Sequence, residues 1–343
     1  MKTGKISESI LRRSVLRQIV NQRQEVVKGA GVGEDCAFLS WKGSARENTE
    51  SFGLMAVATQ TVTLPVKNAA FLAVMAAINN LAASGASPAA ITLAITLPAE
   101  AEESLLRELM KQAEDCCEGL HVQIAGGDTQ VSADVRTPII TATAVGYIQR
   151  EGAVACLQAA KAFDKNRCMD VVVSKWIAME GTAVIAEEKE AELSERYPMR
   201  LILAAKEQKA CLSVETEAAI ALKSGVYAMH DARNGGIFGA LWELSQKLGV
   251  GLNIDLKKIP VRQETIEVCE FYELNPYVLL SGGMLIMVTD CGERLVKALE
   301  DEGIPAAIIG STNGGNDRII ANQEETRYLE PAKPDEIYKI SFN

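Results

Sequence analysis

The alternation of strand-like and helix-like segments constrains the fold of this chain more than any other feature. In the first half, segments rich in small and β-branched residues alternate with segments whose apolar residues recur at helical spacing. The segment 25–41 reads as a glycine-rich loop that enters a strand. Beyond it we expect strands at 52–64, 89–98, 122–131 and 137–149, and helices over 7–20, 67–83 and 101–119. Gly85 and Pro88 follow the apolar helix 67–83 and are typical of a helix end.

The second half continues this alternation with shorter strands and more glycine-rich loops. We expect strands in "VVVSKW", "GLNIDLKKIP", "GGMLIMVT" and "AAIIG", helices in "GTAVIAEEKEAELSERY", around 200–224 and in "CGERLVKALEDEG", and a strand, loop and helix over 225–249. A polar, irregular stretch at about 150–168 separates the halves, and 343 residues exceed a typical single core. The sequence therefore predicts two domains, 1–152 and 153–343, of α/β or mixed α+β class.

Composition narrows the classes of function. The formal net charge of −10 leaves no broad basic footprint for nucleic acid. No apolar run is long enough to span a membrane, and the first residues lack the apolar core of a signal peptide, so we expect a cytoplasmic protein with no membrane partner. The eight cysteines form no CxxC pair, and there are only two histidines, which argues against a zinc site.

Three glycine-containing clusters are candidates for chemistry. In "GVGEDCA" (31–37), Glu34 and Asp35 directly follow flexible glycines. Carboxylate oxygens suit Mg²⁺, and glycine lets the backbone approach phosphate. The alternative is a solvated turn that leads into a strand.

In the second cluster, "AGGDT" (125–129), Asp128 is expected at the end of a strand, where α/β proteins commonly meet ligands. It is a candidate second metal ligand, or else a turn residue that bonds its own backbone. In the third, "HDARNGGIFGALWEL" (230–244), Gly235 and Gly236 lead into a helix whose free N–H groups would offer an anion site. His230 is a candidate general acid or base, or a histidine that simply bonds the backbone.

Five motifs in order carry a resemblance to a known family. "GVGEDCA", "INNLAASGASP", "GGDT", "KWIAMEGTAVIA" and "HDARNGGIFGALWEL" resemble the AIR synthase (PurM-like) superfamily, and most closely the HypE-like hydrogenase maturation proteins and the AIR synthase-related proteins. The resemblance extends from Gly4 to about Tyr338. It implies an N-terminal α/β domain that pairs into a homodimer and a C-terminal α/β domain. It also implies ATP in a cleft near the dimer interface, Mg²⁺ held by N-terminal acids, and activation of an amide or carbonyl oxygen by phosphoryl transfer. A maturation protein is a further implied partner.

The resemblance also assigns positions. Asp35 and Asp128 match acids of the family and are the expected metal ligands. These two acids and His230 are the catalytic candidates. The expected cofactor-binding residues are Lys5, Gly33, Glu34, Asp35, Gln60, Asn80, Gly126, Gly127, Asp128, Thr129, Gly235 and Gly236.

Two positions depart from the family pattern. Gln60 and Asn80 stand where relatives usually carry acids, and carboxylate count largely determines the affinity for divalent metals. The last cysteine is Cys291, so the C-terminal cysteine that accepts a carbamoyl group in cyanide-forming relatives is not present in the sequence. Three functions remain open: an ATP-dependent enzyme acting on an unidentified small molecule, a nucleotide- or metabolite-binding protein that has lost turnover, and a scaffold without ligand.

Overall fold

The computed structural model describes residues 4–42, 52–148, 163–322, 325–331 and 333–342. These residues fall into two compact units. The N-terminal unit comprises Gln24–Gly29, Asp35–Ala153 and Phe342–Asn343, and the C-terminal unit comprises Met1–Arg23, Ala30–Glu34 and Val154–Ser341. The predicted boundary between 152 and 153 lies outside the described residues.

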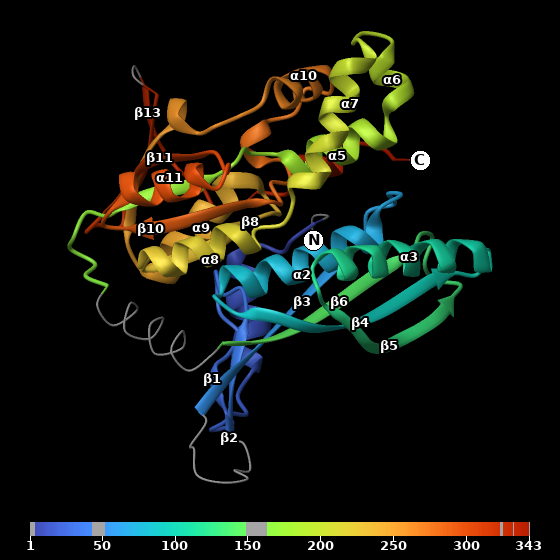
Figure 1. Ribbon diagram of the computed structural model, residues 1–343, viewed down its shortest axis with the longest axis horizontal. Coiled ribbons are helices and arrows are strands. Elements are labelled where there is room, and N and C mark those ends of the chain that lie inside the picture. The colour runs from blue at the N-terminus through green and yellow to red at the C-terminus, as the bar shows by residue number, and fades with distance from the viewer. Residues whose placement is uncertain (1–3, 43–51, 149–162, 323–324, 332, 343) are drawn as a thin grey trace. The chain divides into compact units, whose positions relative to one another are not determined.

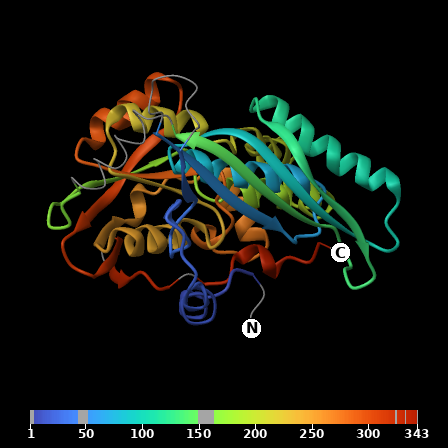
Figure 2. The ribbon, with the colours of Figure 1, turned by 90° about the horizontal axis from the view of Figure 1, so that it is seen from below.

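The N-terminal unit is a six-stranded sheet with two helices on one face (Figures 1 and 2). Its elements are β1 (Val26–Lys28), β2 (Ala37–Lys42), β3 (Phe52–Val62), α2 (Ala69–Ala83), β4 (Ser87–Pro98), α3 (Glu103–Gly119), β5 (Gln123–Ser132) and β6 (Ile139–Ile148). The strand order is β1-β2-β3-β6-β4-β5. Only β4 and β5 pair in parallel, because the crossover helix α3 brings the chain back before the second strand starts.

Helix α2 is apolar nearly all round and is buried along almost its whole length. It contacts β3, β6 and β4 of the sheet and also α3, and every residue of it except Phe71 is buried. The opposite face of the sheet is exposed at alternate positions, as a half-buried strand requires. On that face, hydroxyl pairs join β3 to β6, with Thr59–Thr143 and Thr61–Thr141 Oγ1–Oγ1 distances of 3.0 and 2.9 Å.

The C-terminal unit is built on a seven-stranded sheet of order β13-β12-β9-β11-β7-β10-β8, in which only β12 and β9 are parallel. Its strands are β7 (Asp170–Ser174), β8 (Ala228–Ala232), β9 (Gly251–Asp255), β10 (Met284–Thr289), β11 (Ala306–Asn313), β12 (Arg318–Asn322) and β13 (Glu325–Tyr328). Its α-helices are α1 (Glu8–Ile10), α5 (Met179–Glu188), α6 (Glu190–Ser194), α7 (Met199–Glu207), α8 (Glu215–Ser224), α9 (Gly236–Leu248), α10 (Gln263–Phe271) and α11 (Gly292–Asp301). Short π or 3₁₀ turns lie at Leu11–Val15, Leu16–Gln18, Gln208–Cys211, Leu256–Lys258, Pro276–Val278 and Glu336–Lys339.

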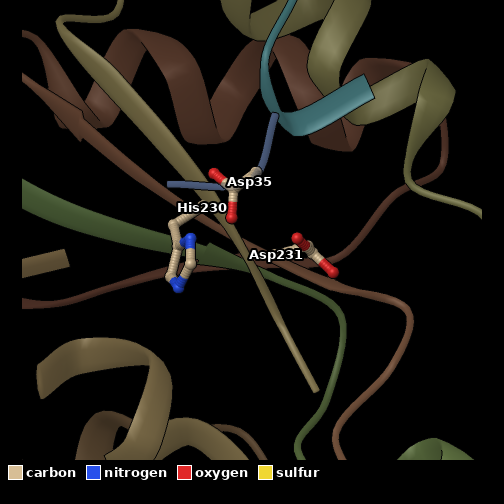
Figure 3. A group of neighbouring side chains, drawn as sticks. All are labelled: Asp35, His230 and Asp231. Carbon is tan, nitrogen blue, oxygen red and sulfur yellow. The ribbon is translucent and has the colours of Figure 1, made fainter. Parts of the chain in front are cut away.

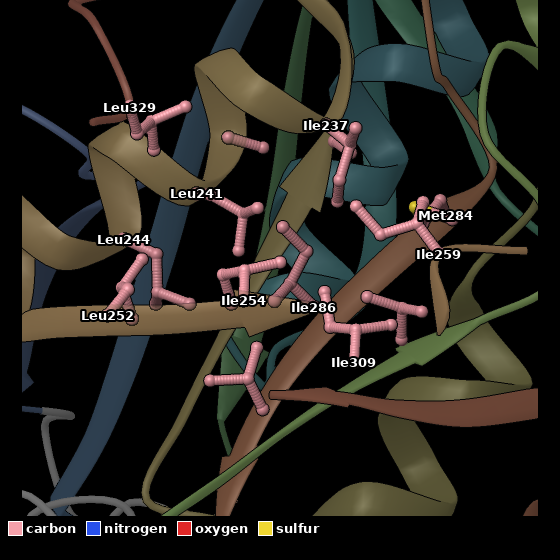
Figure 4. Close-up of a cluster of buried hydrophobic side chains, with 14 of the residues drawn as sticks. Ile237, Leu241, Leu244, Leu252, Ile254, Ile259, Met284, Ile286, Ile309 and Leu329 are labelled. Atoms are coloured by element: carbon pink, nitrogen blue, oxygen red, sulfur yellow. The ribbon is translucent and has the colours of Figure 1, made fainter. Parts of the chain in front are cut away.

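Helix α9 packs the main core of this unit against the sheet. Ile237, Leu241 and Leu244 on α9 meet strand residues that include Ile254 and Ile286 (Figure 4). All six residues of β10 are buried, in keeping with its unbroken apolar run. The core therefore fixes α9 on the sheet, and with it the polar side chains along the helix.

The structure confirms a mixed α/β fold with two unlike sheets. Most expected elements are present within a few residues, including α3 for the helix predicted at 101–119. The sequence prediction missed α10, β12 and β13, which lie in polar or short segments. Within the described ranges, no helix combines the length and apolar character needed to cross a bilayer.

Candidate functional site

The glycine loop 31–34 lies against helix α9 within the C-terminal unit. Gly33 has a φ of +73°, and a Cβ there would sit 2.4 Å from the backbone oxygen of Glu243. Both the left-handed conformation and this close approach require glycine. Beside it, the Glu34 carboxylate lies 3.9 Å from the Lys247 ammonium on the same helix. The loop is therefore seated on α9 and is more than a solvated turn.

Three side chains from distant parts of the sequence meet beside this loop. The Lys5 Nζ donates to Oε1 of Glu243 at 2.5 Å. Nε2 of His230 lies 3.2 Å from the other oxygen, Oε2, of the same carboxylate. His230 is thus bonded to a carboxylate, and Glu243 links two residues that the sequence singled out.

The environment of Glu243 holds its carboxyl in the ionised form. Burial by itself would raise the pKa, since the side chain is only 17% exposed. The hydrogen bond with His230 and the charge of Lys5 outweigh burial and lower the pKa of Glu243 to about 2. Glu243 therefore carries a negative charge throughout the physiological pH range.

His230 and its neighbour Asp231 are both almost fully buried on β8 (Figure 3). Each offers a nitrogen or oxygen ligand atom, and these atoms lie within 4.8 Å of each other. Strand β8 extends from Ala228 to Ala232 and holds His230 at its centre. The strand pairs with β10 on one side, which fixes the direction of both side chains.

The start of α9 differs from the anion site expected there. Gly235 and Gly236 have φ values of +81° and +62°, and a Cβ on Gly236 would sit 2.5 Å from the Tyr277 oxygen. The Gly235 N–H donates to Oδ2 of Asp335 at 2.7 Å. The expectation that the helix start offers free N–H groups is wrong for Gly235, because the protein supplies its own carboxylate.

Asp335 is a buried carboxyl held by backbone donors alone. It accepts the N–H groups of Leu280 and Ile337 at 3.1 and 3.0 Å in addition to that of Gly235. Burial raises the pKa of Asp335 to about 7, against the lowering effect of these three donors, and the charge of Glu180 raises it further. This residue escaped the sequence reading, since a lone aspartate near the C-terminus carries no local signal.

A buried ion pair lies near this carboxyl. Nε and Nη2 of Arg233 donate to the carboxylate oxygens of Glu180 at 2.8–3.2 Å. Burial would lower the pKa of Arg233, but Glu180 raises it, so the guanidinium stays charged. Position 282 requires glycine, because a Cβ there would sit 2.2 Å from Oε2 of Glu180.

In the N-terminal unit, the side chain of Asn80 forms a hydrogen bond with the backbone of Asp35. Its side-chain Nδ2 donates to the carbonyl oxygen of Asp35 at 3.3 Å, and the thiol of Cys36 donates to the carbonyl oxygen of Asn80 at 3.3 Å. Asn79 and Asn80 are both buried within α2, and the residue that caps its C-terminal end is Ser84. An aspartate at position 80 could not donate to the Asp35 carbonyl oxygen, because a carboxylate has no hydrogen.

Asp128 and its neighbours lie on β5, at one edge of the N-terminal sheet. The sequence expectation of a strand end is wrong, since β5 continues through Gly126, Gly127, Asp128 and Thr129 to Ser132. Gly127 allows close passage of two strands: a Cβ there would sit 1.9 Å from the Leu93 oxygen, next to a register shift. Asp128 is exposed on this strand.

The two expected metal ligands are far apart within the N-terminal sheet. Asp35 directly precedes β2, whereas Asp128 lies on β5, four strand spacings away in the order β2-β3-β6-β4-β5. At about 4.8 Å per spacing this is roughly 19 Å along the sheet. Gln60 lies between them on β3, in register with Ala142 of β6. Within one copy of the chain, these residues do not surround a single ion.

Three predicted site residues, Lys5, Gly33 and His230, thus meet at Glu243 on α9. Glu34 lies near Lys247 of the same helix, which Gly235 and Gly236 begin. The signal for Glu243 was available, because it is the one acid in the otherwise apolar run "GGIFGALWEL". Arg233 and Glu180 also fall inside motifs already noted, but their pairing depends on the fold.

Comparison with known proteins agrees with this architecture. The family model "AIR synthase related protein, N-terminal domain" matches residues 33–148, and the model "AIR synthase related protein, C-terminal domain" matches residues 171–321. The chain belongs to the AIR synthase-related family.

Relatives within this family include HypE proteins. The carbamoyl dehydratase HypE of Rhodobacter capsulatus is 27% identical over 245 residues, which cover 70% of this chain and 68% of that protein. A chain of the solved HypE–HypF complex matches with a TM-score of 0.70 and 19% identity over 94% of this chain and 99% of that one. HypE in complex with ATP matches with a TM-score of 0.67 and 18% identity, over 98% of this chain and 97% of that one. At this identity the two structures establish the shared fold.

Proposed function

We propose that this protein is a HypE-like, ATP-using member of its family that activates an amide or carbonyl oxygen of a small molecule. The oxygen would attack the terminal phosphorus of ATP, ADP would leave, and the phosphorylated oxygen would become a leaving group. Positioning and charge neutralisation supply most of the rate in such transfers.

The observation that carries this proposal is the meeting of Lys5, Gly33 and His230 at Glu243, with Glu34 beside Lys247 on the same helix. A glycine loop with an acid, a cation and a titratable imidazole offers the groups that phosphoryl transfer uses. The similarity to HypE solved with ATP, which extends over almost the whole chain, supports the choice of nucleotide.

We further propose a homodimer formed through the N-terminal sheet. Supporting this, the face opposite α2 and α3 carries exposed threonines and leaves the apolar side chain of Tyr147 more than half exposed. Pairing would also add a second set of acids near each edge of the sheet. A protein of hydrogenase maturation is a further proposed partner, by analogy with the HypE–HypF complex.

Magnesium is proposed as a weakly held cofactor. Asp35 and Asp128 are the candidate ligands, and they lie four strands apart in one copy. Gln60 and Asn80 supply no charge, and Asn80 already donates to the Asp35 backbone. Hard divalent cations prefer several carboxylates, so we expect Mg²⁺ affinity to depend on bound ATP.

Thermal denaturation with ATP and Mg²⁺ tests binding. A ligand that binds only the folded state at 100 times its Kd adds about 2.7 kcal/mol to the free energy of unfolding. Lys5→Ala should reduce the stabilisation by ATP, whereas Lys111→Ala, which removes an exposed lysine on α3, should leave it intact. No stabilisation at millimolar ATP would contradict the proposal. Release of phosphate with amide-bearing small molecules then tests turnover.

A second candidate is a nucleotide- or metabolite-binding homodimer that no longer turns over. The hydrogen bond from Asn80 to Asp35 favours this second candidate. The amide donates to a backbone carbonyl at a position where relatives usually carry an acid. ATP binding without phosphate release under any substrate would select this candidate.

A further inference from the structure

Two free cysteines lie at the ends of neighbouring strands in the C-terminal sheet. Cys168 is exposed and comes two residues before β7, and Cys291 is partly buried and lies between β10 and α11. We propose that these thiols are a redox-sensitive pair, which a small-molecule disulfide oxidises to an intrachain disulfide between the entry of β7 and the start of α11. This role does not depend on ATP binding or on turnover.

The register of β7 and β10 places the two cysteines opposite each other. In this antiparallel pair Thr289 faces Asp170 and Val288 faces Val171. Two further steps in the same register bring position 291 opposite position 168. Facing residues of antiparallel strands have Cα atoms about 4.5–5.5 Å apart. A disulfide needs Cα atoms about 4.4–6.8 Å apart, so continuation of the pairing by two residues gives a suitable spacing.

Contacts beyond the last paired residues keep the two segments together. The Gly292 N–H donates to Oδ2 of Asp170 at 3.0 Å, and a Cβ on Gly292 would sit 2.9 Å from the Asp170 Cβ. Nη1 of Arg167 lies 3.2 Å from Oδ2 of Asp290. One contact joins positions 170 and 292 and the other joins positions 167 and 290, so the two contacts bracket both cysteines.

The alternation of side chains along the strands puts both thiols on the same face of the sheet. Met169 and Val288 belong to the core that packs against α9. Successive residues of a strand point to opposite faces, so positions 168 and 291 belong to the other face. On that face the Asp170 side chain meets the start of α11.

Two polar side chains hold the sulfur of Cys291 on this face. Oγ1 of Thr289 lies 3.3 Å from Sγ, and Nη2 of Arg294 donates to Sγ at 3.0 Å. Cys168 is exposed, so a reagent in solution reaches it directly. Cys168 is therefore the thiol that reacts first, and Cys291 is the oriented thiol that resolves the product.

The oxidation consists of two thiol–disulfide exchanges. The thiolate of Cys168 attacks one sulfur of the small-molecule disulfide, whose S–S bond breaks, and one small thiol leaves. Cys291 then loses its proton to water, attacks the Cys168 sulfur and displaces the second small thiol. The two protein thiols lose two electrons and two protons in total, and the reagent disulfide becomes two thiols.

Peptide mapping of the full chain under non-reducing conditions tests the pair. The protein is equilibrated in a buffer of oxidised and reduced glutathione, and the remaining thiols are alkylated before digestion. We expect a cross-link between Cys168 and Cys291, a mass lower by two hydrogens, and reversal of both changes by dithiothreitol. The absence of this cross-link, glutathione that stays attached to Cys168, or a cross-link from Cys168 to any other cysteine would overturn the inference.

Substitutions separate this pair from the other cysteines. Cys291→Ser should leave glutathione attached to Cys168, and Cys168→Ser should abolish the cross-link. Cys211→Ser is the matched control, because Cys211 is also partly buried in the C-terminal unit, and this variant should keep the cross-link.

Urea unfolding gives a second measurement. A cross-link restricts the unfolded chain, so oxidation should raise the urea midpoint of the unsubstituted protein and leave that of Cys291→Ser unchanged. An equal rise in both proteins would contradict the assignment of the cross-link to this pair. If Cys291→Ser does not fold, the peptide map of the unsubstituted protein still decides whether the pair forms.

Discussion

Two largely buried carboxyls lie at helix α9. Asp335 meets the start of the helix, Glu243 is part of the helix near its middle, and their pKa values move in opposite directions. Asp335 accepts hydrogen bonds from the N–H of Gly235, which precedes the first residue of the helix, and from two other backbone N–H groups. Glu243 meets the ammonium of Lys5 and the ring of His230. The pKa of Asp335 rises to about 7, and that of Glu243 falls to about 2.

The opposite directions of the two shifts come from the partners of the carboxyls, since burial acts in the same direction on both. Burial raises the pKa in both cases. The hydrogen bond with His230 and the charge of Lys5 reverse that effect at Glu243, whereas at Asp335 the nearby charge is the acid Glu180, which adds to it. The middle of α9 therefore holds a fixed charge, and the start of α9 holds a group that titrates near neutrality.

Removing the Asp335 carboxyl should have the largest effect on stability. Asp335→Ala leaves three buried N–H groups without their acceptor, and each lost partner costs about 1–3 kcal/mol. We expect a loss of about 4 kcal/mol in the free energy of unfolding, measured with urea. Asp335→Asn keeps an acceptor oxygen and should lose less than half as much. Equal losses in both variants would contradict this account of the helix start.

In the N-terminal unit the buried polar side chain of Asn80 is neutral, and giving it a charge tests the same dependence on the partner group. Asn80→Asp replaces the donor at the Asp35 carbonyl by a carboxylate and should cost about 3 kcal/mol, because the new charge faces an oxygen. Asn79→Asp is the matched control, since it also buries a carboxylate on α2. Calorimetry in the presence of Mg²⁺ distinguishes the roles: a gain in metal affinity for Asn80→Asp would show that the amide replaces a metal ligand.

Neutralising the charged group in the middle of α9 should have an intermediate effect. Glu243→Gln keeps the shape but loses the attraction to Lys5, and we expect a loss of about 2 kcal/mol at pH 7. Lys5 is half exposed, so Lys5→Met should cost less, about 1 kcal/mol. Urea unfolding of the two variants at equal ionic strength measures both, and a larger loss for Lys5→Met would reverse the assigned roles.

The dependence of stability on pH should have opposite signs for the two carboxyls. Glu243 has a lowered pKa, so its contribution is present above about pH 4.5 and is lost as the pH falls toward 2. Asp335 has a raised pKa, so the folded state keeps a proton that the unfolded state releases near pH 4. Its contribution is therefore lost as the pH rises from about 4 to 7.

Unfolding free energies across pH 2–8 test these signs. Glu243→Gln should flatten the acid side of the profile, and Asp335→Asn should flatten the part between about pH 4 and 7. A profile that Asp335→Asn leaves unchanged in that window would show that the carboxyl titrates at its usual pH.

Local pattern was sufficient for most of the fold and for part of the site. The periodicity of 101–119 predicts α3 almost to its ends, and the motif order identifies the family. The same reasoning failed at Asp128, because paired glycines signal a turn as well as a close approach of two strands, and only the position of Leu93 decides between them. It also missed β13, an exposed four-residue strand whose pairing with β12 defines it.

What the sequence by itself determined is most of the elements, the family, and the residue types that a phosphate- and metal-handling site needs. Only the tertiary structure decided which charges meet. Lys5 and Glu243 are 238 residues apart, and His230 lies 13 residues before Glu243 on a different element. The strength of a charge interaction depends on distance and local burial, and neither can be read from spacing along the chain. The fold therefore makes Glu243 an ionised carboxylate and makes Asp335 a carboxyl that titrates near pH 7.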